Sequence, residues 1–431
     1  IRLSLTSEQS VWRRHALVAC GKGFMPNKNT SVASRPVLLF YCQHSLGMGH
    51  LVRSLALATT LAERFRVVFL NGGPFPKGIT APDTIETISL PPLGMTTDGH
   101  LVSRDRRRTV ERAQSLRRKL MLDAFHALRP QVVFIELFPF GRKKFTNELL
   151  PLLEETRSAS IRPLVLCSLR DILVGRDAQG DHDERASVLA NQYFDAILVH
   201  ADPQFARLEE SFHPKTPLQI PVHYTGFVFT EKQPAQTRPL KRAHQIVVSA
   251  GGGIVGEPLL RTAAEAHALV CPHERVPMKL IAGPFLSEAD WQSLRNIVKG
   301  QPGLSLHRSV PDLCAAMRGA TASISQCGYN TALDILRADV PALVVPFAEG
   351  GEDEQMNRAR RLEKLGALRV LDPQHLDALT LAEEIRALPR FTPQAVTLDL
   401  DGAQHTAHLV EELVQAQPSQ QRSDLRETSP Q

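Results

Sequence analysis

The segment VLLFYCQHSLGMGHLVRSLALA, residues 37–58, changes its hydrophobic pattern twice. An apolar run over residues 37–41 leads into the loop HSLGMGH, and apolar residues then recur at helical spacing through residues 51–63. This order predicts a buried strand, a tight turn and a helix, which is the local structure that points free backbone N–H groups at an anion. Gly47 and Gly49 would let the turn bring its backbone close to a ligand.

A second glycine turn opens the other half of the chain. Gly251, Gly252 and Gly253 follow a short β-branched run, residues 245–250, and precede a helical pattern over residues 258–269. In open parallel sheets, ligands bind beyond the carboxyl ends of the strands, which is where both turns would lie. The sequence therefore predicts an α/β fold in which two Rossmann-like, doubly wound domains face a central cleft.

The size and composition fit this interpretation. The chain has 431 residues, of which 43% are hydrophobic and 22% are charged, as expected for a soluble globular protein with two core-forming domains. No apolar run approaches the roughly 18 residues that a membrane span needs. Arg13, Arg14 and His15 interrupt the apolar character of residues 1–20, so we expect no signal peptide there.

The cysteines indicate a reducing compartment. They are scattered without a CxxC pair, and several lie in or beside apolar strand-like runs, where a free cysteine behaves as a small hydrophobic residue. They are Cys20, Cys42, Cys167, Cys271, Cys314 and Cys327. A disulfide framework is therefore not expected, and we predict a cytoplasmic protein.

Strand and helix patterns alternate along both halves, which implies parallel sheets covered on both faces. The predicted strands are residues 37–41, 67–71, 132–135, 164–168 and 196–200, then 245–250, 278–282, 304–307, 322–325, 342–346 and 368–371. We assign residues 1–35 to a poorly ordered extension, 36–229 to the N-terminal domain, 230–244 to a linker, 245–400 to the C-terminal domain, 401–416 to a helix and 417–431 to a disordered tail. We expect the last helix to fold back on the first domain.

His50 is the leading candidate for a catalytic base. It falls in the first turn of the helix that follows the first glycine loop, and an imidazole there would take a proton from a hydroxyl near neutral pH. The alternative is a histidine that only caps or packs. Arg53 would hold an anion or a neighbouring carboxylate, and His44 is a weaker alternative base. Val52 occupies the third position of a GxGxxG fingerprint, so an NAD site is not expected.

The most specific segment is SISQCGYNTALDILRADVPALVVPFAEGGEDEQMNRARRLEKLGA, residues 323–367. It predicts a strand that ends near Gln326 and Gly328 and a helix that begins directly afterwards. The first residues of that helix, Tyr329, Asn330 and Thr331, would offer free N–H donors at the positive end of the helix dipole.

Two further groups in this segment suit a nucleotide sugar. Asp334 follows within two helical turns, where its carboxylate would reach a pair of ribose hydroxyls. Glu354 and Gln355 open the next predicted helix with acid and amide groups that suit a polyhydroxylated sugar. The alternative is a solvated helix start that carries favourable acids in its first turn.

This segment resembles the C-terminal half of GT-B glycosyltransferases, particularly the MurG-like, lipid-linked N-acetylglucosaminyltransferases of family 28 and the UDP-glucuronosyltransferase-like groups. The HSLGMGH loop is similar to the glycine-rich first loop of these enzymes, and the resemblance extends in order over most of residues 36–415. It implies an N-terminal acceptor domain and a C-terminal nucleotide-sugar domain. It also implies that His50 falls on the proposed base of the family.

The resemblance implies the donor contacts as well. The diphosphate would lie against Gly251, Gly252 and Gly253 and against residues 328–331, the ribose against Asp334, and the sugar against Glu354 and Gln355. A hexose-type sugar would pass with inversion from a nucleotide-diphosphate sugar, with UDP favoured, to an acceptor hydroxyl. No cofactor and no bound metal are expected, although residues 181–183 and 399–401 form DxD-like pairs.

The donor sugar and the reaction both stay open. The segment carries EDEQ where many relatives carry DQ or QQ, which leaves the donor sugar open. The pattern GxGHxxR also occurs in UDP-sugar hydrolases, so a nucleotide-sugar hydrolase or epimerase is the alternative. A binding module without catalysis is the third interpretation.

Glu136 is the second catalytic candidate, because it ends an apolar strand and would project toward the cleft. The aromatic residues after it, Phe138 and Phe140, would form an apolar lip for a hydrophobic acceptor, or else a packed loop. Four more polar residues follow apolar strands in the same way: Arg170, Asp171, His200 and Asp202.

Positive charge is concentrated in residues 104–119. The residues are Arg104, Arg106, Arg107, Arg108, Arg112, Arg117, Arg118 and Lys119. They form either a solvated helix face or a surface that attracts an anionic membrane or a phosphorylated acceptor. Aromatic residues make up only 6% of the chain and none interleaves this run, so nucleic acid is not an expected partner. We expect a lipid-linked or amphipathic acceptor and peripheral contact with the inner face of a membrane.

Overall fold

The computed structural model describes residues 35–44, 49–76, 79–96, 99–173, 179–229, 243–274, 276–348 and 353–417. Residues 36–431 group together as one unit, separate from residues 1–35. Gly47, nearly all of the predicted N-terminal extension, most of the predicted linker and most of the predicted tail lie outside the described residues. The predicted domain limits therefore remain predictions.

The first sheet has seven parallel strands in the order β3-β2-β1-β6-β7-β8-β9. The strands are β1 (Val37–Cys42), β2 (Arg66–Asn71), β3 (Glu86–Ser89), β6 (Val132–Glu136), β7 (Leu164–Arg170), β8 (Ala196–His200) and β9 (Val222–Tyr224). Its helices are α2 (Gly49–Leu61), α3 (Val110–Leu128), α4 (Thr146–Ser158) and α5 (Gln179–Tyr193). The short strands β4 (Leu93–Met95) and β5 (Leu101–Ser103) form an antiparallel pair, and single 3₁₀ turns occur at Lys143–Phe145 and Leu208–Glu210.

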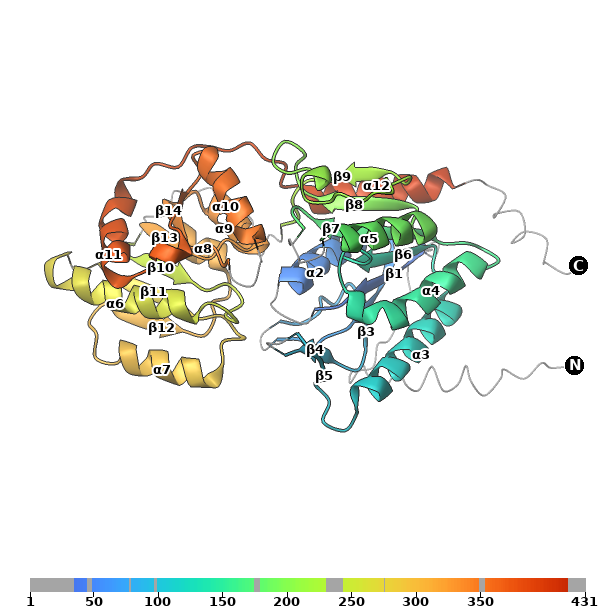
Figure 1. Cartoon of the computed structure of the whole chain (residues 1–431), viewed down its shortest axis with the longest axis horizontal. Coiled ribbons are helices and arrows are strands. Elements are labelled where there is room, and N and C mark those ends of the chain that lie inside the picture. The colour runs from blue at the N-terminus through green and yellow to red at the C-terminus, as the bar shows by residue number, and fades with distance from the viewer. Residues whose placement is uncertain are drawn as a thin grey trace, which may run out of the picture. The chain divides into compact units, whose positions relative to one another are not determined.

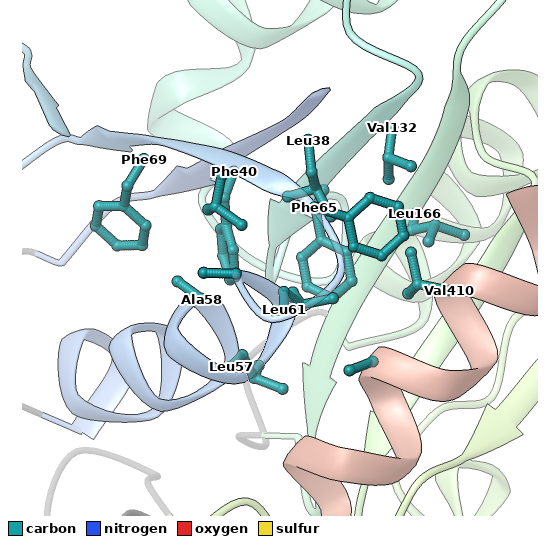
Figure 2. Close-up of a cluster of buried hydrophobic side chains, with 14 of the residues drawn as sticks. Leu38, Phe40, Leu57, Ala58, Leu61, Phe65, Phe69, Val132, Leu166 and Val410 are labelled. Carbon is teal, nitrogen blue, oxygen red and sulfur yellow. The ribbon is translucent and has the colours of Figure 1, made fainter. Parts of the chain in front are cut away.

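Aromatic packing holds the centre of this sheet together. The ring of Phe40 on β1 lies 5.3 Å from that of Phe69 and 4.8 Å from that of Phe134, on the two neighbouring strands. Apolar residues of α2, among them Leu57 and Leu61, complete the same buried cluster (Figure 2). A continuous apolar strand such as β1 is stable only when a helix covers each face, which explains the alternation of strands and helices.

The last helix, α12 (Gly402–Ala416), belongs to this core although it ends the described chain. Ala403, Ala407 and Val410 recur on one face of the helix and join the cluster of β1 and α2. Figure 2 labels Val410 at this contact. The chain therefore returns to its first sheet after completing the second.

The second sheet has six parallel strands in the order β12-β11-β10-β13-β14-β15. They are β10 (Ile246–Ser249), β11 (Met278–Ile281), β12 (Leu304–His307), β13 (Ala322–Ser325), β14 (Ala342–Val344) and β15 (Arg369–Val370). The helices are α6 (Glu257–Glu274), α7 (Glu288–Val298), α8 (Leu313–Arg318), α9 (Tyr329–Ala338), α10 (Glu354–Lys364) and α11 (Ala378–Ala387), with 3₁₀ turns at Pro373–His375 and Leu388–Arg390. Helices α6 and α11 pack side by side (Figure 1).

Both sheets reverse their strand order beside their first strand. In the first sheet β1 lies between β2 and β6, and in the second β10 lies between β11 and β13. The carboxyl ends of strands at such a reversal border the crevice in which doubly wound folds bind ligands. The loops after β1, β10 and β13 therefore lie where a ligand is expected.

The doubly wound α/β architecture predicted from the sequence is confirmed. Each predicted strand is present, with ends within two residues of the expected ones. Four strands and one helix were not predicted, namely β3, β4, β5, β9 and α11. Strands β3 and β9 are only partly buried, so they lack the continuous apolar run that marks a central strand.

One residue of the basic run at positions 104–119 is buried. The run is therefore not an exposed basic surface along its whole length. Arg117 on α3 has no exposed surface, and its guanidinium donates to Glu148 on α4, to Gln43 and to the carbonyl oxygens of Gly72 and Pro91. Arg117 thus ties α3 and α4 to the ends of β1 and β2. The other basic residues of the run are exposed.

The second glycine turn is shaped by close backbone packing. Gly253 has φ of 93°, and a Cβ atom built on it would lie 2.4 Å from the carbonyl oxygen of Ala282. Gly283, with φ of 87°, faces the same turn, where its Cβ would lie 2.5 Å from the carbonyl carbon of Gly252. The two loops therefore need glycine both for backbone conformation and for space.

We predict that Gly253→Ala lowers the free energy of unfolding by about 1–3 kcal/mol, because the new methyl group adds a clash to an unfavourable φ. Urea unfolding followed by circular dichroism would measure the change. Gly180→Ala is the matched control, since Gly180 has open space around it and should change stability by less than about 0.5 kcal/mol. Equal stability of the two variants would contradict the prediction.

Candidate functional site

A buried carboxylate organises the carboxyl edge of the first sheet. Glu136 ends β6 and has no exposed surface. Its Oε1 atom lies 2.5 Å from Nδ1 of His50 and 2.7 Å from Nη2 of Arg53, both on α2. His50 and Arg53 are three residues apart and so share one face of the helix. Because β1 pairs with β6, the start of α2 meets the end of β6.

The surroundings of His50 keep its imidazole neutral. Burial lowers the pKa of His50 to about 3, and Arg142 and Arg170 act in the same direction, while Glu136 opposes them. Burial alone would raise the pKa of Glu136, but His50 and the guanidinium groups of Arg142 and Arg53 outweigh it and hold that pKa well below its usual range. An ionised Glu136 therefore accepts a hydrogen bond from Nδ1–H of a neutral His50, which leaves the lone pair on Nε2.

Arg142 is a member of this site that the sequence analysis did not identify. Its side chain is only 13% exposed, and Nη2 lies 3.4 Å from Oε2 of Glu136. The available signal in the sequence was that Arg142 follows Glu136 by only six residues, in the loop ELFPFGR. The expected apolar lip is not exposed, because Phe138 and Phe140 are buried and Phe140 packs against Phe212 at 4.9 Å between ring centres.

The start of α9 is an uncapped helix N-terminus. The first intrahelical bond runs from Ala332 N–H to the carbonyl oxygen of Gly328, so the N–H groups of Tyr329, Asn330 and Thr331 come before it. Gly328 occupies the N-cap position but has no side chain that could bond the free N–H groups. A Cβ atom built on it would meet nothing within 4 Å. Free donors, a positive dipole end and open space make this a suitable place for an anion.

The other two turns approach this helix start. Asn330 Nδ2 lies 3.5 Å from the carbonyl oxygen of Gly49, the first residue of α2. A Cβ atom on Gly251 would lie 3.5 Å from Thr331 Oγ1. The structure thus brings together one residue from each turn and sets the helix that carries His50 beside the N-terminus of α9.

Two backbone N–H groups of the second glycine turn already form hydrogen bonds within the turn. Gly251 N–H donates to Ser249 Oγ and Gly253 N–H to the carbonyl oxygen of Ala250. Gln326, also among the residues predicted to bind the donor, supports this turn by donating from its amide nitrogen to the carbonyl oxygen of Val255 at 3.1 Å. The N–H of Gly252 has no partner among the described residues and stays available.

Tyr329 joins the two halves through its hydroxyl group. The hydroxyl donates to the carbonyl oxygen of His200 and accepts from Val228 N–H, each at 2.9 Å. Arg53 and Arg358 lie over its ring, with 5.3 and 5.8 Å between guanidinium carbon and ring centre. Only the backbone N–H of Tyr329 is therefore available to a ligand.

Two of the polar residues expected to meet the donor, Glu354 and Gln355, already have hydrogen-bonding partners. Both oxygens of Glu354 pair with arginine, Oε1 with Arg358 at 2.6 Å and Oε2 with Arg170 at 2.5 Å. Oε1 of Gln355 accepts from the N–H groups of Cys327 and Phe347, at 3.0 and 3.2 Å, which leaves its amide nitrogen. Asp334 is half-buried on α9 near Cys314, whose pKa burial raises to about 11 with the help of that carboxylate.

The remaining candidates have structural partners. His44 Nε2 lies 3.0 Å from Asn71 Oδ1, and Asp202 accepts from the N–H groups of Gln204 and Asp399. In the described ranges, no three His, Cys, Asp or Glu side chains are grouped so that they could hold a metal ion. None of the described helices has the length and apolar character needed to cross a membrane.

Comparison with known proteins supports a specific class. A family model described as the glycosyltransferase family 28 C-terminal domain matches residues 289–410. A UDP-N-acetylglucosamine–N-acetylmuramyl-(pentapeptide) pyrophosphoryl-undecaprenol N-acetylglucosamine transferase from Acidithiobacillus ferrooxidans is 35% identical over 79 residues, or 18% of this chain. The chain spans only 22% of the length of that relative.

Solved structures resemble the chain over most of its length. The calicheamicin glycosyltransferase CalG4 superposes with a TM-score of 0.55 at 17% identity and covers 92% of this chain and 100% of its own. Acinetobacter baumannii MurG gives a TM-score of 0.54 at 14% identity, with coverage of 88% and 99%.

Two doubly wound parallel sheets with these structural likenesses define the GT-B fold. Within that class of fold, residues 289–410 match the glycosyltransferase family 28 C-terminal domain, and the chain is similar to glycosyltransferases of the MurG type.

His200 illustrates a buried histidine with a structural role. It ends β8 with no exposed surface, and its two ring nitrogens contact Ser168 Oγ at 2.8 Å and Thr225 Oγ1 at 2.9 Å. Burial, together with the nearby charge of Arg53, lowers the pKa of His200 well below its usual value. The unfolded chain therefore binds a proton below about pH 6.5 that the folded chain does not bind.

We predict that folding stability falls as the pH decreases below about 6.5, and that His200→Gln makes this decline shallower by up to about 1.4 kcal/mol per pH unit. The variant keeps a polar group but removes the titration. Urea unfolding at pH 7.5, 6.5 and 5.5 would measure both slopes. His100→Gln, at an exposed position, should leave the slope unchanged, and an unchanged slope in His200→Gln as well would contradict the prediction.

Proposed function

We propose that this protein is a glycosyltransferase that moves a hexose-type sugar from a nucleotide-diphosphate sugar, with UDP as the carrier, to an acceptor hydroxyl. The observation that carries the proposal is that a neutral histidine lies close to a helix N-terminus with free N–H donors. His50, kept neutral by burial and oriented by Glu136, lies in the first turn of α2, and Gly49 of the same turn contacts Asn330 at the uncapped start of α9.

The chemistry follows from the free atoms of the site. Nε2 of His50 takes the proton of the acceptor hydroxyl while the hydroxyl oxygen forms a bond to the anomeric carbon. The bond from that carbon to the diphosphate oxygen breaks, and attack from the opposite face inverts the configuration. Glu136 stabilises the imidazolium that forms, as a buried carboxylate does for a catalytic histidine.

Fixed dipoles stabilise the departing diphosphate. The N–H groups of Tyr329, Asn330 and Thr331, together with that of Gly252, can meet the developing charge without reorganisation. The buried acids nearby, Glu136, Asp171 and Glu354, are all paired with arginine or histidine. These pairings support a mechanism in which backbone donors replace a metal ion at the diphosphate.

We assign the remaining donor contacts to side chains of α9 and α10. Asp334 binds the ribose hydroxyls, and the amide nitrogen of Gln355 binds a hydroxyl of the sugar. The relatives that share this region are named as N-acetylglucosamine transferases, which supports UDP-N-acetylglucosamine as the first donor to test.

The acceptor side supports an amphipathic or lipid-linked substrate. Relatives carry pyrophosphoryl-undecaprenol in their names, and the exposed basic residues of this chain would attract an anionic membrane surface. They are Arg104, Arg106, Arg107, Arg108, Arg112, Arg118, Lys119, Lys143 and Lys144. This arrangement supports a cytoplasmic protein that contacts the inner face of the membrane peripherally.

The proposal is tested by incubating the purified protein with UDP-N-acetylglucosamine, UDP-glucose, a dTDP-sugar or a GDP-sugar. Thermal shifts identify the nucleotide, and UDP release is then measured with and without membrane lipid extract as acceptor. Release that depends on the extract, with radiolabelled sugar recovered in lipid, supports transfer. Rapid release without acceptor would instead favour hydrolysis, and binding without release would favour a binding module.

We predict that His50→Gln lowers kcat by about 10²- to 10⁴-fold, the usual contribution of a general base. The dissociation constant for UDP should change by less than about twofold, because no donor contact is assigned to the imidazole. Steady-state kinetics and isothermal titration calorimetry measure the two effects. His408→Gln, on the exposed face of α12, is the control. A near-normal kcat in His50→Gln would exclude His50 as the base.

A further inference from the structure

A buried ion pair connects α10 of the second sheet with the end of β7 in the first. Arg358 is 1% exposed and Asp171 is 2% exposed. Nε and Nη2 of Arg358 each donate to a different oxygen of Asp171, both at 2.7 Å. Two parallel hydrogen bonds of this kind determine orientation as well as distance.

The same guanidinium holds the turn that precedes α9. Nη1 of Arg358 donates to the carbonyl oxygen of Cys327 at 2.9 Å, while the N–H of Cys327 donates to Gln355 Oε1 at 3.0 Å. The peptide groups on both sides of Cys327 are thus held from α10. Gly328 follows directly and begins the uncapped helix start.

A second contact reinforces the connection. Arg170, the residue before Asp171, pairs with Glu354 at 2.5 Å, and Glu354 also pairs with Arg358 at 2.6 Å. Two consecutive residues at the end of β7 therefore hold the first two turns of α10. Burial makes each contact necessary, because an unpaired charge at these positions would have neither water nor a partner.

We propose that Asp171 is a positioning residue for the donor: acting through Arg358, it sets the Cys327–Gly328 turn and the start of α10, so donor affinity depends on a residue of the acceptor half. Asp171 itself touches no donor atom. The inference rests on the proposed function, since it concerns the diphosphate and sugar contacts assigned to α9 and α10. In this arrangement Glu354 has a structural role, because it pairs with Arg170 and Arg358. The amide nitrogen of Gln355 is then the group that meets the sugar.

The test compares ligand affinity in folded protein. Asp171→Asn keeps the shape of the side chain but removes its charge, so Arg358 loses the bidentate carboxylate and keeps only Glu354. We expect the dissociation constants for UDP and UDP-N-acetylglucosamine to rise at least about tenfold, measured by calorimetry well below the unfolding transition. Asp171→Glu should recover part of the affinity. In the double variant Asp171→Asn/Arg358→Gln, the losses should be less than additive.

Glu210→Gln is the matched control. Glu210 pairs with Arg361, one helical turn after Arg358 on α10, so the variant also removes a pair between the two halves, but an exposed one without contact to Cys327. It should change both constants by less than about twofold. A merely structural role of Asp171 would lower the unfolding temperature and leave the affinity of the folded protein intact.

The outcomes separate the inference from the function on which it rests. If the wild-type protein binds UDP-N-acetylglucosamine and folded Asp171→Asn binds it equally well, the positioning role is wrong and the proposed function stands. If Asp171→Asn does not fold, Asp171→Glu decides, because its altered length should weaken binding measurably and unchanged affinity would overturn the role. If the wild-type protein binds none of the tested nucleotide sugars, both proposals fail.

Discussion

A buried guanidinium needs carboxylate partners, and one of the two that Arg358 has, Asp171, lies in the other half of the chain. Its bidentate pair with Asp171 lets α10 hold the Cys327–Gly328 turn, and that turn determines where the N-terminus of α9 points. Removing one partner of such a pair is costly because the other charge stays buried. The geometry of the donor side is therefore a property of both sheets, although the residues that would meet the donor belong to one.

The site around His50 follows the same rule with the charges reversed. Glu136 is the buried carboxylate, and Arg53, Arg142 and His50 surround it. Burial, helped by the positive charges of Arg142 and Arg170, lowers the pKa of His50, so the imidazole stays neutral. The hydrogen bond to Glu136 occupies Nδ1 of this neutral imidazole and leaves Nε2 unprotonated.

The central strands were predictable because a parallel sheet covered on both faces requires continuous apolar runs, as in β1, β6 and β10. The edge strands β3 and β9 were missed because partly exposed strands carry no such run. Arg117 was misinterpreted for a related reason. A basic residue among basic residues looks solvated, and its partner Glu148 lies on a different helix.

The sequence by itself determined that glycine turns follow the first strand of each sheet and that His50, Glu136 and the start of α9 lie at carboxyl ends of strands. Strand, turn and helix are local, so neighbouring residues suffice to specify them. Only the tertiary structure decided which polar atoms remain free for a ligand. The hydroxyl of Tyr329 and both oxygens of Glu354 are engaged by residues far away in the sequence. Hydrogen bonds and ion pairs of that range form only when the folded chain brings the two halves into contact, and no local pattern encodes them.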